Sequence, residues 1–101
     1  MTVREAIALA AASAITEVDG VAGPSTEYGT ALGGGRIPGV LCTANARGTY
    51  DVTLYVKARP VPLAALGERL MGRVADASAQ AGFGEDLGDV RVVVLDIVEP
   101  E

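Results

Sequence analysis

The sequence has 101 residues, a length typical of one domain; half of them are hydrophobic, although only four are aromatic. The formal net charge is −5, with 13 acidic against 8 basic residues, which argues against tight nucleic-acid binding and against direct docking on an anionic membrane. No stretch approaches the ~18–20 apolar residues of a membrane span, histidine is absent, and the single cysteine, Cys42, excludes an internal disulfide.

The first predicted element is a helix over residues 3–18. Thr2 and Glu5 have the spacing of a capping box, in which two side chains bond the first free N–H groups of a helix. Because Glu5 interrupts the Ala-rich start, we do not interpret it as a signal peptide. Gly20 fits the position just beyond a helix end, where a left-handed backbone suits glycine. Residues spaced by three and four form one hydrophobic stripe: Ile7, Ala11, Ala14, Ile15 and Val18.

Residues 20–39 hold seven glycines, and this composition predicts a long mobile loop. A phosphate-binding loop needs the pattern G-x-x-x-x-G-K-[ST], whereas "GTALGGGRIPG" lacks the lysine. The phrase "GVAG" at 20–23 resembles the clamp of KH RNA-binding domains, but it carries no charge and follows only one helix. We therefore expect a flexible connection. A small-ligand site in this loop and a KH-like RNA-binding module are the alternatives.

Residues 40–46 and 50–59 alternate between hydrophobic and polar positions, which predicts two antiparallel strands. A turn at Arg47-Gly48-Thr49 would set Ala44 opposite Val52 and place both hydrophobic faces on one side. The second strand directs a row of polar and aromatic side chains outward: Thr53, Tyr55, Lys57 and Arg59. Since Tyr and Arg are favoured in protein interfaces, the row predicts either a partner surface or a solvated sheet face.

A second helix is predicted to begin near Pro62 and to end at Gly82, because proline suits the first turn and glycine the position after the last one. Its hydrophobic stripe has helical spacing: Leu63, Leu66, Leu70, Val74, Ala77 and Ala81.

The last predicted element is a strand over residues 90–98, "VRVVVLDIV", which Pro100 would end. Strict alternation places Val93, Leu95 and Ile97 on one face, and Val92, Val94, Asp96 and Val98 on the other. Both faces are nearly apolar, so we expect a well-covered strand or a contact between copies of the chain. Exposed on a monomer, Val92, Val94 and Val98 would form an unusual apolar patch, which predicts a homo-oligomer.

The order helix-strand-strand-helix-strand predicts an α+β fold for residues 1–101. The expected architecture is a two-layer sandwich, with a three-stranded sheet and two helices on one face. The whole chain is expected to form a single domain.

No catalytic, cofactor-binding or metal-binding residues are predicted, and no cofactor is expected. Without histidine, Cys42 lacks the usual base and is expected to be a small core residue. The acidic group "GEDLGD" lacks the spacing of a calcium loop. A small enzyme using Tyr55, Lys57 or the Gly-rich loop is a further hypothesis. The predicted partner surface comprises Thr53, Tyr55, Lys57, Arg59, Val92, Val94 and Val98.

The phrases "ITEVDGVAG" (15–23), "YDVTLYVKAR" (50–59) and "VRVVVLDIVEP" (90–100) together resemble the alkaline-shock, or envelope stress response, protein family of Gram-positive bacteria. The most specific of them is "EVDGVAG" at 17–23. The resemblance implies a non-enzymatic bacterial protein of the cytoplasm that acts through protein–protein contacts. Members of the family are often held near the membrane by a small membrane protein, and some self-assemble. We therefore expect a protein partner, no bound nucleic acid and no direct membrane insertion.

Overall fold

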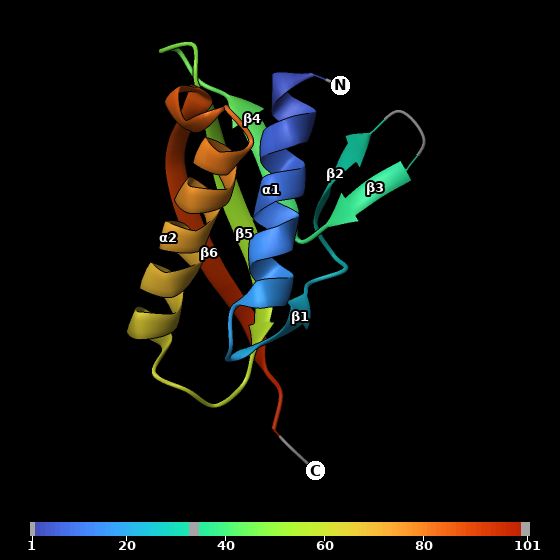
Figure 1. The fold of residues 1–101 in the computed structure, drawn as a ribbon. Helices are drawn as coiled ribbons and strands as arrows, with labels where there is room; N and C mark the ends of the chain where they lie inside the picture. Colours follow the sequence, from blue (N-terminus) through green and yellow to red (C-terminus); the bar gives the residue numbers. More distant parts are fainter. Residues whose placement is uncertain (1, 33–34, 100–101) are drawn as a thin grey trace.

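The computed structural model describes residues 2–32 and 35–99 (Figure 1). Two glycines of the predicted loop, Gly33 and Gly34, and the predicted strand end at Pro100 lie outside the described residues. The described elements are, in chain order, α1 (Val3–Glu17), β1 (Val21–Pro24), β2 (Gly29–Leu32), β3 (Gly35–Pro38), β4 (Val40–Ala44), β5 (Tyr50–Ala58), α2 (Leu63–Gln80), the 3-10 helix η1 (Gly84–Asp86) and β6 (Leu87–Ile97). The predicted α+β class, with a sheet packed against two α-helices, is confirmed.

The main sheet is organised around β5, which pairs on both of its edges. Along one edge β6 runs parallel to it; along the other, β4 is antiparallel to its first half and β1 to its end. These four strands therefore make a sheet that is three strands wide, because β4 and β1 follow one another along the same edge. The prediction of three strands missed β1.

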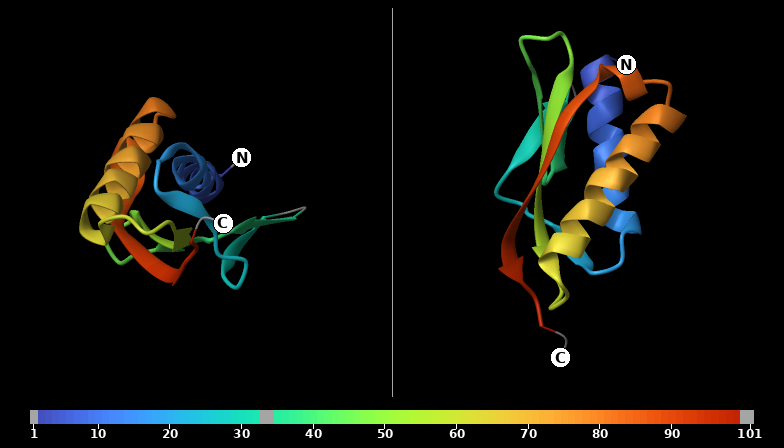
Figure 2. Two further views of the ribbon diagram at one scale, coloured as in Figure 1. Left: turned by 90° about the horizontal axis from the view of Figure 1, so that it is seen from below. Right: turned by 90° about the vertical axis from the view of Figure 1, so that its left-hand side faces the viewer.

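Both described α-helices cover the same face of this sheet, as predicted. In the right-hand view of Figure 2 the strands lie to one side and α1 and α2 to the other. Within residues 2–32 and 35–99, no helix covers the opposite face. We call this opposite face the outer face.

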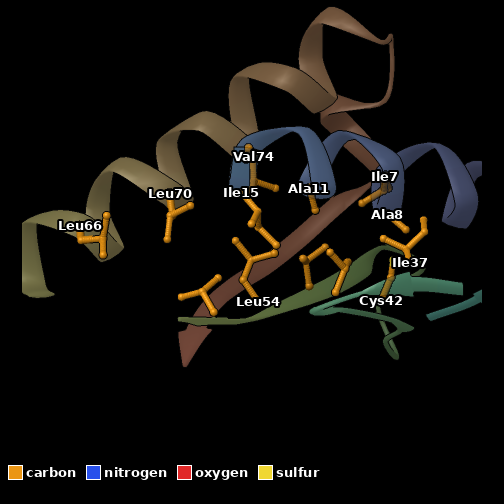
Figure 3. Close-up of a cluster of buried hydrophobic side chains, with 14 of the residues drawn as sticks. Ile7, Ala8, Ala11, Ile15, Ile37, Cys42, Leu54, Leu66, Leu70 and Val74 are labelled. Atoms are coloured by element: carbon orange, nitrogen blue, oxygen red, sulfur yellow. The ribbon is translucent and has the colours of Figure 1, made fainter. Parts of the chain in front are cut away.

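The core lies between the helices and the inner face of the sheet (Figure 3). The predicted stripe of α1 is buried at Ile7, Ala11 and Ile15, and Val18 is half-buried against the same cluster. One half of the predicted capping box is present, since the Glu5 N–H donates to Thr2 Oγ1 at 3.2 Å. The Thr2 hydroxyl in turn donates to Glu5 Oε1 at 3.1 Å. The fully buried hydrophobic side chains that α2 and β5 contribute are Val52, Leu54, Val56, Ala58, Leu66, Leu70 and Val74.

The register of the β4–β5 hairpin differs from the prediction by two residues. Cys42, not Ala44, lies opposite Val52. The cause is the turn, in which Asn45 Oδ1 accepts from the N–H groups of Arg47 and Thr49 and so closes a longer loop. An even shift preserves the alternation, so the predicted inward faces remain correct.

The prediction of a loop over residues 20–39 is wrong for the described part of that segment, which is mostly β-structure. β1 pairs with the end of β5, and β2 pairs with β3 to form a separate hairpin. Such four-residue, Gly-rich strands carry too little alternation to be detected from sequence. The hairpin is fixed to the domain by Ile37, whose side chain enters the core.

A buried threonine joins this hairpin to the main sheet. Thr30 in β2 is only 3% exposed, its hydroxyl donates to Val40 O at 2.6 Å, and it accepts from the Cys42 N–H at 3.2 Å. Both backbone groups belong to β4. The side chain therefore satisfies part of an edge of β4 that would otherwise present unpaired polar groups.

Candidate functional site

The outer face of the sheet is a surface that neither α-helix covers. Paired residues of neighbouring strands share a face, and the register sets Leu41 of β4, Thr53 of β5 and Arg91 of β6 in one row. Further rows join Thr43 with Asp51, Tyr55 with Val93, and Lys57 with Asp96. The surface therefore mixes aliphatic, aromatic and oppositely charged side chains.

An aromatic pair covers one end of the outer face. The rings of Tyr28 and Tyr55 are stacked, with centroids 4.1 Å apart and planes 16° from parallel. Tyr28 comes from the connection between β1 and β2 and is 43% exposed. A backbone bond from the Gly39 N–H to Tyr28 O, at 2.7 Å, helps to hold that connection over the sheet. Sequence reasoning missed Tyr28; its only signal is that it is the one aromatic residue in the Gly-rich segment.

The predicted partner residues of β5 lie together. Thr53, Tyr55 and Lys57 are half-buried on the outer face. Arg59 follows the strand and is exposed, and its N–H donates to Gly20 O at 2.8 Å.

The predicted partner residues of β6 do not join that surface. Val92 and Val94 lie opposite Leu54 and Val56 on the inner face, half-buried against the core. Val98 lies beyond the end of β6 and is 39% exposed. The structure therefore brings three of the seven predicted residues together on the outer face and places Val92 and Val94 on the inner face.

A β-bulge also changes which residues of β6 face outward. Val94 pairs with Val56, but Asp96 pairs with Lys57, so one extra residue of β6 interrupts the alternation. Asp96 consequently lies on the outer face beside Lys57, whereas strict alternation predicts that it shares a face with Val92 and Val94.

A cluster of polar side chains joins the β4–β5 turn to the start of β6. Asp51 Oδ1 accepts from Asn45 Nδ2 and from the Asp89 N–H, both at 2.9 Å. Gly88 is packed so closely that a Cβ there would collide with the Asp51 carboxylate. The bond from Asn45, followed by that from the Asp89 N–H, holds the pKa of Asp51 below its ordinary value of 3.8. The cluster therefore fixes this corner of the sheet.

We expect Asp51 to make the stability of the domain depend on pH. Its lowered folded-state pKa means that the stabilisation is present above 3.8 and is lost as pH falls through the folded-state value. Urea unfolding of the wild type and of Asp51→Asn, from neutral pH to about pH 3, should show their difference in stability shrinking with acidity. A constant difference would contradict this role for the carboxylate.

The structure gives the surroundings of Cys42 and of the "GVAG" phrase. Cys42 is 2% exposed, and its burial raises the pKa of the thiol, which disfavours the reactive thiolate. Within residues 2–32 and 35–99, no three metal-ligating side chains come together. The "GVAG" phrase forms the turn at Gly20 and the strand β1, whose backbone pairs with β5. It is therefore not an open clamp between two helices.

One groove lies between the two α-helices. It is lined mainly by small residues of α1 and α2, including Ala10 and Ala77, and by the exposed Leu9. An ion pair between Arg73 and Glu17, at 2.6 Å, lies at its border. We assign no chemistry to this groove, because its two charged residues already pair with each other.

No helix in the described part of the chain combines the length and hydropathy needed to cross a bilayer. Comparisons with protein-family models, with curated proteins and with solved structures each found no match.

Proposed function

We propose that this chain is a non-enzymatic interaction protein that binds a protein partner through the outer face of its sheet. The observation that carries the proposal is the one-sided architecture: both described helices cover one face and leave Leu41, Tyr55, Arg91 and Val93 facing outward. Tyrosine and arginine are enriched at protein interfaces, where aromatic rings supply contact area and guanidinium groups supply directed hydrogen bonds.

The Tyr28–Tyr55 stack adds support to this choice of surface. Stacked rings hold each other in place, so little side-chain freedom remains to be lost when a partner covers them. Lys57 and Asp96 place both signs of charge beside the stack, which favours a partner of matching mixed polarity over a uniformly charged one. The formal charge of −5 makes a nucleic acid a poor fit to the same surface.

The cellular setting of the proposal comes from the resemblance to the envelope stress response family. The phrases "EVDGVAG" (17–23) and "YDVTLYVKAR" (50–59) support that assignment. On this basis we place the protein in the cytoplasm, close to the cell envelope, with a small membrane protein as its partner. The second phrase is β5 itself, so the segment that carries the resemblance also supplies the proposed surface.

Affinity capture from detergent-solubilised cells tests the proposal. The tagged wild type should retain a membrane protein that the double variant Tyr55→Ser, Lys57→Glu loses. Glu68→Lys, a charge change at an exposed position of α2, is the matched control and should retain it. Circular dichroism should first show that all three proteins are folded.

Loss of the partner with both the outer-face variant and the control would contradict the choice of surface. Capture of RNA in place of protein, in a salt-sensitive manner, would favour the KH-like alternative instead.

A further inference from the structure

The strand β6 lies at a free edge of the sheet. It spans Leu87–Ile97 and pairs with β5 alone among the described residues. The right-hand view of Figure 2 shows it running the length of the sheet with no strand beyond it. A long, β-branched edge presents unpaired N–H and C=O groups and is a template for another strand.

The backbone geometry identifies the residues that face this edge. Tyr55 donates its N–H to Gly39 O and accepts from the Ser25 N–H, at 2.7 and 2.8 Å, so its backbone groups serve the β4 and β1 side. The residues on either side of Tyr55 in β5 direct their backbone N–H and C=O groups to β6, since the backbone groups of successive residues in a strand point to alternate edges. In the observed parallel register, this leaves the N–H and C=O of Val92 and Val94 pointing to the free edge.

We infer that a second copy of this chain pairs with this edge, β6 against β6, antiparallel and with Val93 opposite Val93. In this register Val92 of each copy lies opposite Val94 of the other, so the groups that face the edge bond each other. Arg91 of each copy lies across from Asp96 of the other, on the outer face. A two-fold contact must be self-complementary, and this strand carries the required opposite charges on either side of one central residue.

The bulge is what makes the charges meet. Asp96 lies on the same face as Arg91 only because one residue of β6 is passed over between Val94 and Asp96. Arg91 pairs with the β5 residue two before the partner of Val93, and Asp96 pairs with the β5 residue two after it. The two charges therefore lie at equal distances along the strand on either side of Val93. The self-complementarity therefore comes from the observed register, because strict alternation would set the two charges on opposite faces.

The exposed side chains at the end of β6 also support this pairing. Leu95, Ile97 and Val98 are 42%, 46% and 39% exposed, which leaves hydrophobic surface at one end of an edge strand. The pairing would bring this end of each copy beside the first half of β6 in the other. The Ile97 N–H already bonds Asp96 Oδ1 at 2.9 Å, so we expect the ladder between copies to be strongest from Val92 to Val94.

The pairing goes beyond the proposed function and can be tested without it. It would join two sheets edge to edge and set two outer faces side by side, doubling the surface offered to a partner. Because purified protein suffices for the test, failure to dimerise would leave the partner proposal standing, and failure to find a partner would leave this one standing.

Sedimentation equilibrium of the purified full chain over a wide concentration range is the first measurement. The wild type should move from the mass of one chain to that of two. Val92→Pro removes an N–H that the edge geometry leaves unbonded within one copy, so it should stay folded and remain monomeric. A wild type that stays monomeric at every concentration, or a folded Val92→Pro that still dimerises, would overturn the inference.

A charge exchange tests the register. Asp96→Arg should raise the dissociation constant about tenfold or more, because two-fold symmetry applies the repulsion with Arg91 twice. The double variant Arg91→Asp, Asp96→Arg should restore dimerisation, and Glu68→Lys on α2 should leave it unchanged. Equal weakening by the single and the double variants would contradict the proposed register.

Discussion

Replacing Gly39 with alanine is expected to lower the free energy of unfolding by about 2–4 kcal/mol. Gly39 has a φ of +75°, which strains any residue with a side chain, and an added Cβ would lie 2.6 Å from Pro24 Cβ and 2.8 Å from Tyr55 O. Its backbone also joins the β1–β2 connection to the sheet, since the Gly39 N–H donates to Tyr28 O and Gly39 O accepts from the Tyr55 N–H. Both strain and overpacking therefore act at one residue.

Gly48→Ala is the matched control for this prediction. Gly48 has a similar φ of +84°, but no described atom lies within 4 Å of its built Cβ. Gly48→Ala should therefore lower the free energy of unfolding only by the cost of the strained backbone, about 1 kcal/mol. Urea unfolding of both variants gives the comparison, and equal losses would show that the packing around Gly39 is looser than the structure describes.

Replacing Thr30 with valine is expected to lower the free energy of unfolding by about 2–4 kcal/mol. Valine keeps the shape but removes the hydroxyl that bonds Val40 O and the Cys42 N–H, so two buried groups of β4 lose their partner. Thr30→Ser should keep most of the stability, because serine retains the hydroxyl. Thr43→Val, at an exposed position of β4, should change the free energy of unfolding by less than about 0.5 kcal/mol.

The same unfolding experiments decide the outcome for Thr30. A loss as small as that of Thr43→Val would mean that the β2–β3 hairpin contributes little to the fold. Together with Gly39, this result tests whether the segment 20–39, predicted as a loop, is part of the structural unit.

The parts of the fold that could be predicted from sequence are those with a strong periodic signal. The hydrophobic stripe and the Thr2 cap define α1, and the regular alternation of Val52, Leu54 and Val56 defines β5. Pro62 and Gly82 bracket α2 to within two residues. In each of these elements, local preference and burial favour the same structure.

The remaining parts depend on contacts that no local pattern reveals. β1 exists because β4 leaves part of an edge of β5 unpaired, and the β2–β3 hairpin is fixed by Thr30 and Ile37, which bind elements elsewhere in the fold. The hairpin register depended on hydrogen bonds of Asn45, and the faces of β6 depended on a bulge. Hydrophobic periodicity does not encode such events.

The candidate site was predictable to the extent that it follows β5. Thr53, Tyr55 and Lys57 lie on one face because a regular strand places them there. Tyr28 lies against Tyr55, although it comes from the β1–β2 connection and not from β5. Val92 and Val94 lie on the opposite face, because the register of β6 pairs them with inward-facing residues of β5.

Site-specific photo-crosslinking in living cells tests the central claim most directly. A photoreactive amino acid at Val93, on the outer face, should capture a distinct membrane protein, with any second copy of the chain recognised by its mass. The same amino acid at Met71, exposed on α2, should not capture that protein. Capture from Met71 alone, or no protein other than the chain itself at either position, would contradict a role for the outer face in binding a partner.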